Sequence, residues 1–234
     1  MNFRKGEIFA IDKPCKMTSF GALAHVRYLL SHTLGYKVKI GHAGTLDPLA
    51  TGVLVLCTGK ATKQIEQLQA HTKEYTATLQ LGATTASYDM EHEVNAHYPT
   101  EQITRERIES VLDNFVGDIQ QVPPTYSACK VDGERAYNLR RSGESVELKP
   151  KNIHIDSIEL TAFDPAKMQM SIRVVCGKGT YIRALARDIG RALDSGAYLT
   201  ALRRTRTGDF SIADCIDFDH FQEWLDKQEI DKEL

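Results

Sequence analysis

The 234-residue sequence predicts a mixed α and β fold, in one large domain or in one domain that carries an insertion. The first observation is that two apolar patterns are interleaved. Alternating apolar residues are typical of half-buried strands, and apolar residues that recur every three or four positions are typical of amphipathic helices. The second is that 42% hydrophobic and 26% charged residues are ordinary values for a globular protein, which excludes a disordered, collagen-like or coiled-coil chain.

The first third of the chain contains one clear helix pattern. This helix should begin at Ser19, because serine is a common N-cap, and end at Gly35, because glycine adopts the left-handed conformation that closes a helix. Leucine and valine residues between them recur at helical spacing. The elements expected around it are a strand at 7–11, a glycine-rich loop at 41–52, a buried strand at 53–57, a helix through Ile65 and Leu68, and a strand at 74–81.

The rest of the chain should begin with a polar loop over residues 84–100. Thr104 and Thr180 each precede a run with helical periodicity and are expected to be N-caps. Residues 126–150 carry many charges and tyrosines without periodicity, which is typical of an insertion. The remaining expected elements are strands at 153–162 and 168–176 and a short helix around Phe221, Trp224 and Leu225.

Charge is distributed in blocks along the chain. The formal net charge of −2 argues by itself against a nucleic-acid-binding protein, because such proteins usually carry a basic excess. Yet residues 1–73 and 173–206 each carry a net charge of +6, whereas 74–172 and 207–234 each carry −7. The two basic blocks could meet in the folded chain and form one positive face, and the alternative is scatter without function.

Cysteine and histidine spacing argues against two kinds of site. The five cysteines lie dozens of residues apart without a C-x-x-C pair, and the eight histidines form no H-x-x-x-H pair, so we expect neither a disulfide framework nor a zinc site. The N-terminus lacks the apolar segment of a signal peptide, and the longest clean apolar run is only 53–57. We therefore expect a soluble, cytoplasmic protein without a membrane segment.

The glycine-rich loop carries a single acid, Asp47, among apolar residues and ahead of the buried strand. A partly desolvated carboxylate could serve there as a nucleophile or a base, provided that a cation keeps it ionised. The local alternative is that Asp47 caps the turn before Pro48. A phosphate-binding loop is excluded, because G-x-x-x-x-G-K-[ST] is absent.

Segment 41–52 resembles the catalytic motif of the TruB-type tRNA pseudouridine-55 synthases, in which an Asp within G-x-L-D-P-x-A-T-G breaks the glycosidic bond of a uridine. Six further segments match the family in the same order, so that the seven together cover almost the whole chain. Seven motifs in family order are not expected by chance. The six are Asp12-Lys13-Pro14 with Thr18-Ser19, Lys73-Glu74-Tyr75, Leu81-Gly82 with Asp89, the run from Pro123 to Lys130, the run from Gly177 to Arg183, and Leu202-Arg203-Arg204-Thr205 with Gly208 and Phe210.

The resemblance implies an α+β pseudouridine synthase fold, with a mixed, mostly antiparallel sheet flanked by helices and loops. It implies a catalytic domain over residues 1–210 with a thumb-like insertion at about 122–152. Residues 211–234 are then an acidic helical tail, too short for the PUA RNA-binding domain that many members append. The implied reaction is isomerisation of the T-loop uridine of tRNA without cofactor or metal. The implied partner is the T stem-loop of tRNA, and we expect a monomer with no obligate protein partner.

Three residues match the catalytic positions of the family. Asp47 is the essential carboxylate, Arg183 the arginine that pairs with it, and Tyr75 the tyrosine that stacks on the target base and is a candidate to remove the C5 proton. Whether Asp47 adds to the ribose or removes a ribose proton stays open. Without the resemblance, Arg183 is a surface charge on the first turn of a helix, where a cation is mildly disfavoured, and Tyr75 is an aromatic residue at the edge of the core.

Three further matches concern the pocket for the flipped base. By the resemblance, Asp89 lies on the far side of Arg183, and Tyr181 and Leu202 form walls against which the extruded base packs. The alternative for Tyr181 and Leu202 is that both are plain core residues.

Three more matches concern the RNA around that base. His42 corresponds to a histidine that reaches into the RNA loop, and Lys13 to a lysine near the pocket, where a structural role is the alternative. Lys130 belongs to the thumb, whose basic and aromatic residues suit phosphate contact and stacking. The alternative for the thumb is a solvated loop.

The chain also departs from the family pattern. Lys16 stands where the motif D-K-P-x-G has glycine, so we expect an altered backbone there. Residues 90–93 replace the usual glycine turn after Asp89, which leaves the shape of that loop open. Two other functions stay open: a tRNA-folding chaperone or RNA-binding protein without catalysis, and a pseudouridine synthase that acts on another RNA.

Overall fold

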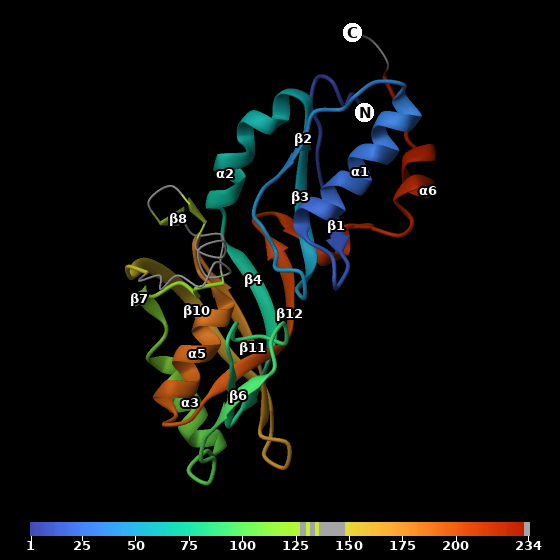
Figure 1. Ribbon diagram of the computed structural model, residues 1–234. Helices are drawn as coiled ribbons and strands as arrows, with labels where there is room; N and C mark the ends of the chain where they lie inside the picture. Colours follow the sequence, from blue (N-terminus) through green and yellow to red (C-terminus); the bar gives the residue numbers. More distant parts are fainter. Residues whose placement is uncertain (127–129, 132–133, 136–147, 232–234) are drawn as a thin grey trace. The chain divides into compact units, whose positions relative to one another are not determined.

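Figure 1 shows the chain in a computed structural model. It divides into two units, one made of Met1–Tyr75 and Arg203–Leu234 and the other of Thr76–Leu202. Strands β4 (Lys73–Leu81) and β12 (Ala197–Thr207) each contain a boundary between the units. Antiparallel and parallel strand pairs both occur beside helices, which confirms the expected α+β class with a mixed sheet. The structure describes residues 1–126, 130–131, 134–135 and 148–231.

The first unit is built on β3 (Thr51–Thr58), which is buried along almost its whole length because its side chains are mostly apolar on both faces. β1 (Ile8–Lys13) is antiparallel to β3, and β12 is parallel to it with Arg204 opposite Gly52. The strand order is β14-β1-β3-β12. The other elements are β2 (Ile40–His42), η1 (Gly59–Gln64), α2 (Ile65–Ala70), β13 (Phe210–Ser211), η2 (Ile212–Asp214), β14 (Ile216–Asp217) and α6 (Phe221–Asp226).

Helix α1 (Ser19–Leu34) packs its apolar face against β1 and β3 in the core of the first unit. It ends at Gly35 in the left-handed conformation, with a φ of 72°, as expected. Its N-cap is Thr18, however, and not Ser19. Thr18 Oγ1 accepts a hydrogen bond from a backbone amide of the first turn, whereas the Ser19 hydroxyl is bound to the backbone of Leu46.

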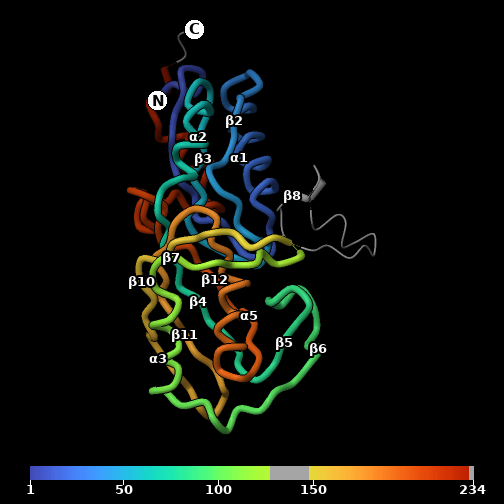
Figure 2. The backbone as a smooth tube through the Cα atoms, turned by 90° about the vertical axis from the view of Figure 1, so that its left-hand side faces the viewer, coloured from blue at the N-terminus to red at the C-terminus, as the bar shows by residue number. Residues whose placement is uncertain are grey.

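In the second unit the strand order is β12-β4-β11-β10-β7. The long strand β10 (Lys151–Asp164) pairs antiparallel with both β11 (Gln169–Cys176) and β7 (Gly117–Gln121). Helices α3 (Arg105–Asp113) and α5 (Ile182–Ala192) lie side by side, and α3 packs on β10 (Figures 1 and 2). The expected strands at 153–162 and 168–176 are thus confirmed, whereas β7 and β12 have no counterpart among the expected elements.

Residues 84–100 are not a plain polar loop. β5 (Ala83–Thr85) pairs antiparallel with β6 (Val94–His97), and Figure 2 shows both strands beside α5. The side chains of β6 are mostly exposed, so the segment lacks the apolar alternation by which a strand is recognised in a sequence.

The two threonines expected as N-caps behave differently. Thr104 caps α3, because its Oγ1 accepts a hydrogen bond from the Arg107 amide over 3.2 Å. Thr180 does not cap α5: its hydroxyl donates to the Gly177 carbonyl over 3.1 Å, and Tyr181 occupies the N-cap position. The Thr180 side chain closes the strand-to-helix turn instead.

The expected insertion at 122–152 falls for the most part outside the described residues. Within it, β8 (Lys130–Val131) pairs antiparallel with β9 (Glu134–Arg135). The division into a catalytic domain at 1–210 and a tail at 211–234 stays a prediction. In the described part of the chain, no helix is both long and apolar enough to span a bilayer.

Candidate functional site

The glycine-rich loop between β2 and β3 is tied down on both sides of Asp47. Before it, the Leu46 amide donates to Ser19 Oγ over 2.8 Å, and the same hydroxyl donates to the Leu46 carbonyl over 2.9 Å. After it, the Ala50 amide donates to the Asp47 carbonyl over 3.1 Å and closes a tight turn. Leu46 and Ala50 are buried while Asp47 is partly exposed, so the loop carries this carboxylate on a fixed backbone.

Arg204 holds both ends of the loop from the interior of the first unit. Only 1% of the residue is exposed, and its guanidinium donates from Nε to the Val53 carbonyl over 2.8 Å and from Nη2 to the Gly44 carbonyl over 3.1 Å. At Gly52, where φ is 104°, an added Cβ would lie 2.1 Å from the Arg204 carbonyl oxygen, so that only glycine fits. The motif that contains Arg204 is visible in the sequence but its burial is not, which is why it is missing from the expected site.

Lys13 is fully buried, and its ammonium donates to the carbonyl oxygens of Pro14 (2.7 Å), Met17 (2.6 Å) and Pro48 (3.3 Å). An ammonium has three N–H donors, so all of them are engaged. Burial lowers the pKa of Lys13 to about 8, against smaller opposite effects that include the negative charge of Asp47. These contacts support the structural alternative, in which Lys13 fixes the residue that follows Asp47.

His42 lies at the end of β2, close to the start of the same loop. Its Nδ1 is buried and has no hydrogen-bond partner among the described residues. Burial, and then the positive charge of Arg204, lower the pKa of His42, so the ring is neutral at pH 7. A buried polar atom without a partner costs free energy, so this ring nitrogen calls for an explanation.

Tyr75 lies on β4 and is 8% exposed. It shares the buried side of this strand with Lys73, whose ammonium donates to the carbonyl oxygens of Gln69 and His71. The carboxylate of the adjacent Glu74 accepts a hydrogen bond from the Thr205 hydroxyl over 2.9 Å. The two residues that precede Tyr75 are thus both held by side-chain contacts.

In the second unit, Arg183 and Asp89 form a buried ion pair. Nε of Arg183 lies 3.6 Å from Oδ2 of Asp89, and these side chains are 4% and 7% exposed. The Arg183 Nη1 donates to the Ser87 carbonyl over 3.3 Å, while the other oxygen of Asp89 accepts hydrogen bonds from the Ser87 hydroxyl and from the Glu91 amide. Two expected residues are therefore brought together, and the surface-charge alternative for Arg183 is wrong.

Tyr181 and Leu202 are both half-buried in the second unit. The Tyr181 amide donates to Gln121 Oε1 over 2.9 Å and its carbonyl accepts from Gln121 Nε2 over 3.2 Å, so Gln121 fixes the start of α5. Lys130 lies in β8, and its side chain is outside the described part of the structure.

The expected site residues fall into two groups, one in each unit. Within the first, Lys13, His42 and Asp47 lie around one loop; within the second, Asp89 and Arg183 pair. The pairing of Asp47 with Arg183 stays a prediction. Among the described residues, no three or more His, Cys, Asp or Glu side chains gather in a way that could hold a metal ion.

The first unit also has a basic hollow that the charge blocks did not locate. It encloses about 460 Å³, and four lysines and one arginine line it. The Arg4 guanidinium lies over the Tyr36 ring, 4.0 Å from its centroid. Clustered cations beside an aromatic ring suit a polyanion such as nucleic acid. The lining residues are Phe3, Arg4, Tyr36, Lys37, Lys39, Gly59, Lys60 and Lys63.

Two family models match consecutive parts of the chain. Residues 31–182 match the model described as TruB family pseudouridylate synthase (N terminal domain), and residues 183–234 match the one described as tRNA pseudouridylate synthase B C-terminal domain. Two curated relatives, both named tRNA pseudouridine synthase B, are similar along nearly their whole length. The protein of Bacteroides thetaiotaomicron is 61% identical, with 100% of this chain and 98% of that protein covered. The protein of Flavobacterium johnsoniae is 48% identical, with 95% and 97% covered.

Solved structures agree with these matches. A chain in "Crystal Structure of a Cbf5-Nop10-Gar1 Complex" has a TM-score of 0.71 at 28% identity, and 97% of this chain and 58% of that chain are covered. For "Structure of H/ACA RNP bound to a substrate RNA containing 2'-deoxyuridine" the TM-score is 0.66 at 27% identity, with 97% and 57% covered. The chain thus spans a little more than half of those chains. With a family model over more than half of its residues, it belongs to the TruB family of pseudouridylate synthases and has the pseudouridine synthase fold.

Proposed function

We propose that this chain is a tRNA pseudouridine synthase that isomerises the T-loop uridine, position 55 of tRNA, to pseudouridine. The observation that carries the proposal is 61% identity, over the whole chain, to a protein named tRNA pseudouridine synthase B. The fixed backbone around Asp47 adds physical support, since a catalytic carboxylate has to be held in one geometry.

The proposed reaction is balanced without another reagent. The bond between N1 of uracil and C1′ of the ribose breaks, the uracil turns, and its C5 bonds to C1′. The C5 proton leaves and N1 carries a proton in the product. Asp47 starts this sequence, either as a nucleophile that adds to C1′ or as a base that removes a ribose proton.

Arg183 is assigned as the partner of the Asp47 carboxylate, and Asp89 as the residue that positions Arg183. A guanidinium that is 4% exposed costs free energy unless a charge and hydrogen bonds compensate it, and Asp89 and the Ser87 carbonyl supply both. These contacts already restrict the Arg183 side chain. Pairing with a second carboxylate therefore costs little further conformational entropy.

Three side chains are assigned to the flipped base. A uridine inside folded RNA is stacked, so the enzyme has to extrude it and offset the lost stacking with an aromatic face and apolar walls. Tyr75 supplies the face, and its hydroxyl is the candidate to remove the C5 proton. Tyr181 and Leu202 supply the walls, in keeping with their partial burial.

The remaining assignments concern RNA outside the pocket. His42, whose Nδ1 has no partner among the described residues, enters the RNA loop as the base leaves it. The basic hollow and Lys130 of the thumb contact phosphates of the T stem-loop. In this proposal the enzyme acts in the cytoplasm as a monomer.

An unmodified tRNA transcript tests the proposal directly. The purified protein should convert the uridine at position 55, as mapped by carbodiimide labelling and primer extension, and Asp47→Asn should give no product. Asp209→Asn, which removes an exposed acid, is the matched control and should react like the original chain. No product from the unchanged protein, or equal product from Asp47→Asn, contradicts the proposal.

If the tRNA stays unmodified, two further measurements separate the other two functions. A chaperone without catalysis would speed tRNA folding and leave uridine 55 unmodified. A synthase for another RNA would leave tRNA unmodified, and mapping of pseudouridine in total RNA from a deletion strain would then show a missing position elsewhere.

A further inference from the structure

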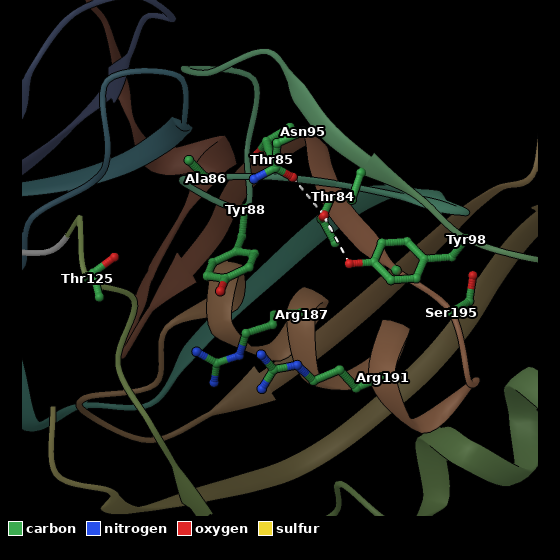
Figure 3. A pocket seen from close by; sticks show the side chains of 12 residues that line it. Thr84, Thr85, Ala86, Tyr88, Asn95, Tyr98, Thr125, Arg187, Arg191 and Ser195 are labelled. Carbon is green, nitrogen blue, oxygen red and sulfur yellow. Dashed lines mark hydrogen bonds between the residues drawn. The ribbon is translucent and has the colours of Figure 1, made fainter. Parts of the chain in front are cut away.

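The second unit encloses a cavity of about 560 Å³ that none of the assigned roles uses (Figure 3). This volume lies in the range of roughly 300–1,000 Å³ that is usual for sites that bind small molecules. Its walls come from β5, β6, the last turns of α5 and the segment that follows α5. The lining residues are Thr84, Thr85, Ala86, Tyr88, Asn95, Ala96, Tyr98, Thr125, Arg187, Arg191, Ser195 and Gly196.

Two arginines one helical turn apart line the cavity, and they differ in how their charges are compensated. Arg187 is buried and fixed: its guanidinium donates to both oxygens of Asp188, over 2.8 and 3.1 Å, and to the Val122 carbonyl over 2.9 Å. Arg191 is exposed, and its guanidinium has no hydrogen bond or ion pair with any described residue. None of the described residues that line the cavity is acidic, so the charge of Arg191 is available to an anion.

The cavity also offers aromatic surface and neutral polar groups. Tyr98 is 41% exposed, and one side of its ring rests on Gly196, where an added Cβ would lie 2.6 Å from a ring carbon. Its hydroxyl points to the Thr84 hydroxyl at 3.5 Å, and Thr84 donates to Asn95 Oδ1 over 2.9 Å (Figure 3). The ring is therefore held in place with surface left to stack on.

Tyr88 lines the cavity and directly precedes Asp89, which pairs with Arg183. Its backbone is left-handed, with a φ of 59°, and its carbonyl accepts a hydrogen bond from the Leu199 amide over 3.0 Å. A bulky residue in that conformation is strained, and strain of this kind is concentrated at functional sites. The same turn directs the Tyr88 ring over Arg187 and directs Asp89 to Arg183.

We propose that this cavity binds one nucleotide of the substrate RNA other than the uridine that reacts, with its phosphate on Arg191 and its base on the ring of Tyr98. The chemistry favours a nucleotide, because an unneutralised guanidinium selects a phosphate and an aromatic face beside hydroxyl and amide groups selects a base. The inference rests on the proposed function, since the ligand is part of the RNA on which the enzyme acts.

Salt-dependent binding of unmodified tRNA tests the phosphate contact. Arg191→Ala should raise Kd on the order of tenfold, because a hydrogen bond to a charged group is lost. It should also lower the slope of log Kd against log salt by about 0.7–0.9, the loss of one phosphate contact. Arg191→Lys should keep the slope. Arg105→Ala, at an exposed arginine of α3, removes the same charge and should change neither quantity.

Two variants of Tyr98 test the contact with the base. Tyr98→Ala should raise Kd on the order of tenfold by loss of stacking, and Tyr98→Phe, which keeps the ring, should bind tRNA nearly as well as the unchanged protein. Circular dichroism and thermal melting of each variant show whether it is folded.

The outcomes separate this inference from the proposed function. If the unchanged protein makes no pseudouridine in tRNA, the proposed function fails, whatever the cavity does. If it makes pseudouridine and Arg191→Ala matches Arg105→Ala in Kd and in salt slope, the cavity does not contact RNA and the inference is overturned. A loss in Arg191→Ala without a loss in Tyr98→Ala overturns the assignment of a base to the cavity.

Discussion

The guanidinium of Arg204 and the carbonyl oxygen of Gly44 are joined by a 3.1 Å hydrogen bond inside the first unit. Through this bond and a second one to Val53, a residue far along the chain fixes the loop that carries Asp47. Arg204 belongs to β12, and the first unit includes this strand from residue 203 onward. The end of β12 thus positions the loop.

Arg204→Met should remove these bonds at nearly constant volume and leave two buried carbonyl groups without donors. We expect a loss of about 2–4 kcal/mol in the free energy of unfolding, measured by urea denaturation. Arg105→Met on α3, where the arginine is exposed, should cost little. At a temperature where Arg204→Met stays folded, its kcat for tRNA should fall more than its KM rises, and equal kcat values would contradict the positioning role.

Lys16 stands where the family motif has glycine, and its backbone is left-handed, with a φ of 61°. This conformation favours glycine, so the lysine bears steric strain, and the altered backbone stays a prediction. Lys16→Gly should be more stable than Lys16→Ala by about 1 kcal/mol in urea denaturation, because only glycine escapes the steric cost. Equal stability of the two variants would show that the backbone at residue 16 is not strained.

Asp89→Asn should destabilise the second unit, since it leaves the buried Arg183 without its compensating charge. Removal of one member of a buried pair typically costs about 3–5 kcal/mol. The matched change Asp118→Asn, at an exposed acid that pairs with His154, should leave the free energy of unfolding nearly unchanged. Similar losses in the two variants would contradict the role of Asp89 in holding Arg183.

The lowered pKa of His42 predicts how the free energy of unfolding depends on pH. Between the folded pKa and the unfolded value near 6.5, the unfolded chain binds more protons, so stability falls as the pH drops below about 6.5. His42→Gln should lose this part of the dependence, and the exposed control His25→Gln should keep it. Urea denaturation at a series of pH values between about 5 and 7.5 measures the difference, and parallel curves for both variants would refute it.

Patterns that depend on neighbours in sequence predict the fold well. β3, α1 and β4 are recognisable because their apolar spacing is set by burial of a whole face, and Gly35 closes α1 by its own conformational freedom. The Asp47 loop and the order of motifs are likewise local, so family membership could be predicted.

Features that depend on distant partners could not be predicted. Ser19 is a good N-cap by composition, but Leu46 takes its hydroxyl and Thr18 caps the helix instead. The burial of Arg204 and the strand pairing of β6 arise only when remote segments meet. For the same reason, the pairing of Asp47 with Arg183 is a matter for experiment.

The hydroxyl groups of Thr18 and Ser19, at the start of α1, couple local opening of the helix to local opening of the Asp47 loop. The Thr18 hydroxyl accepts a hydrogen bond from the Gly21 amide, and the Ser19 hydroxyl accepts one from the Leu46 amide. Fraying of the first helical turn would break both bonds and expose the two amide protons to exchange with solvent. The two amides should therefore belong to one cooperative opening unit in hydrogen exchange. The lifetime of the folded Asp47 loop is then set by the first turn of a helix.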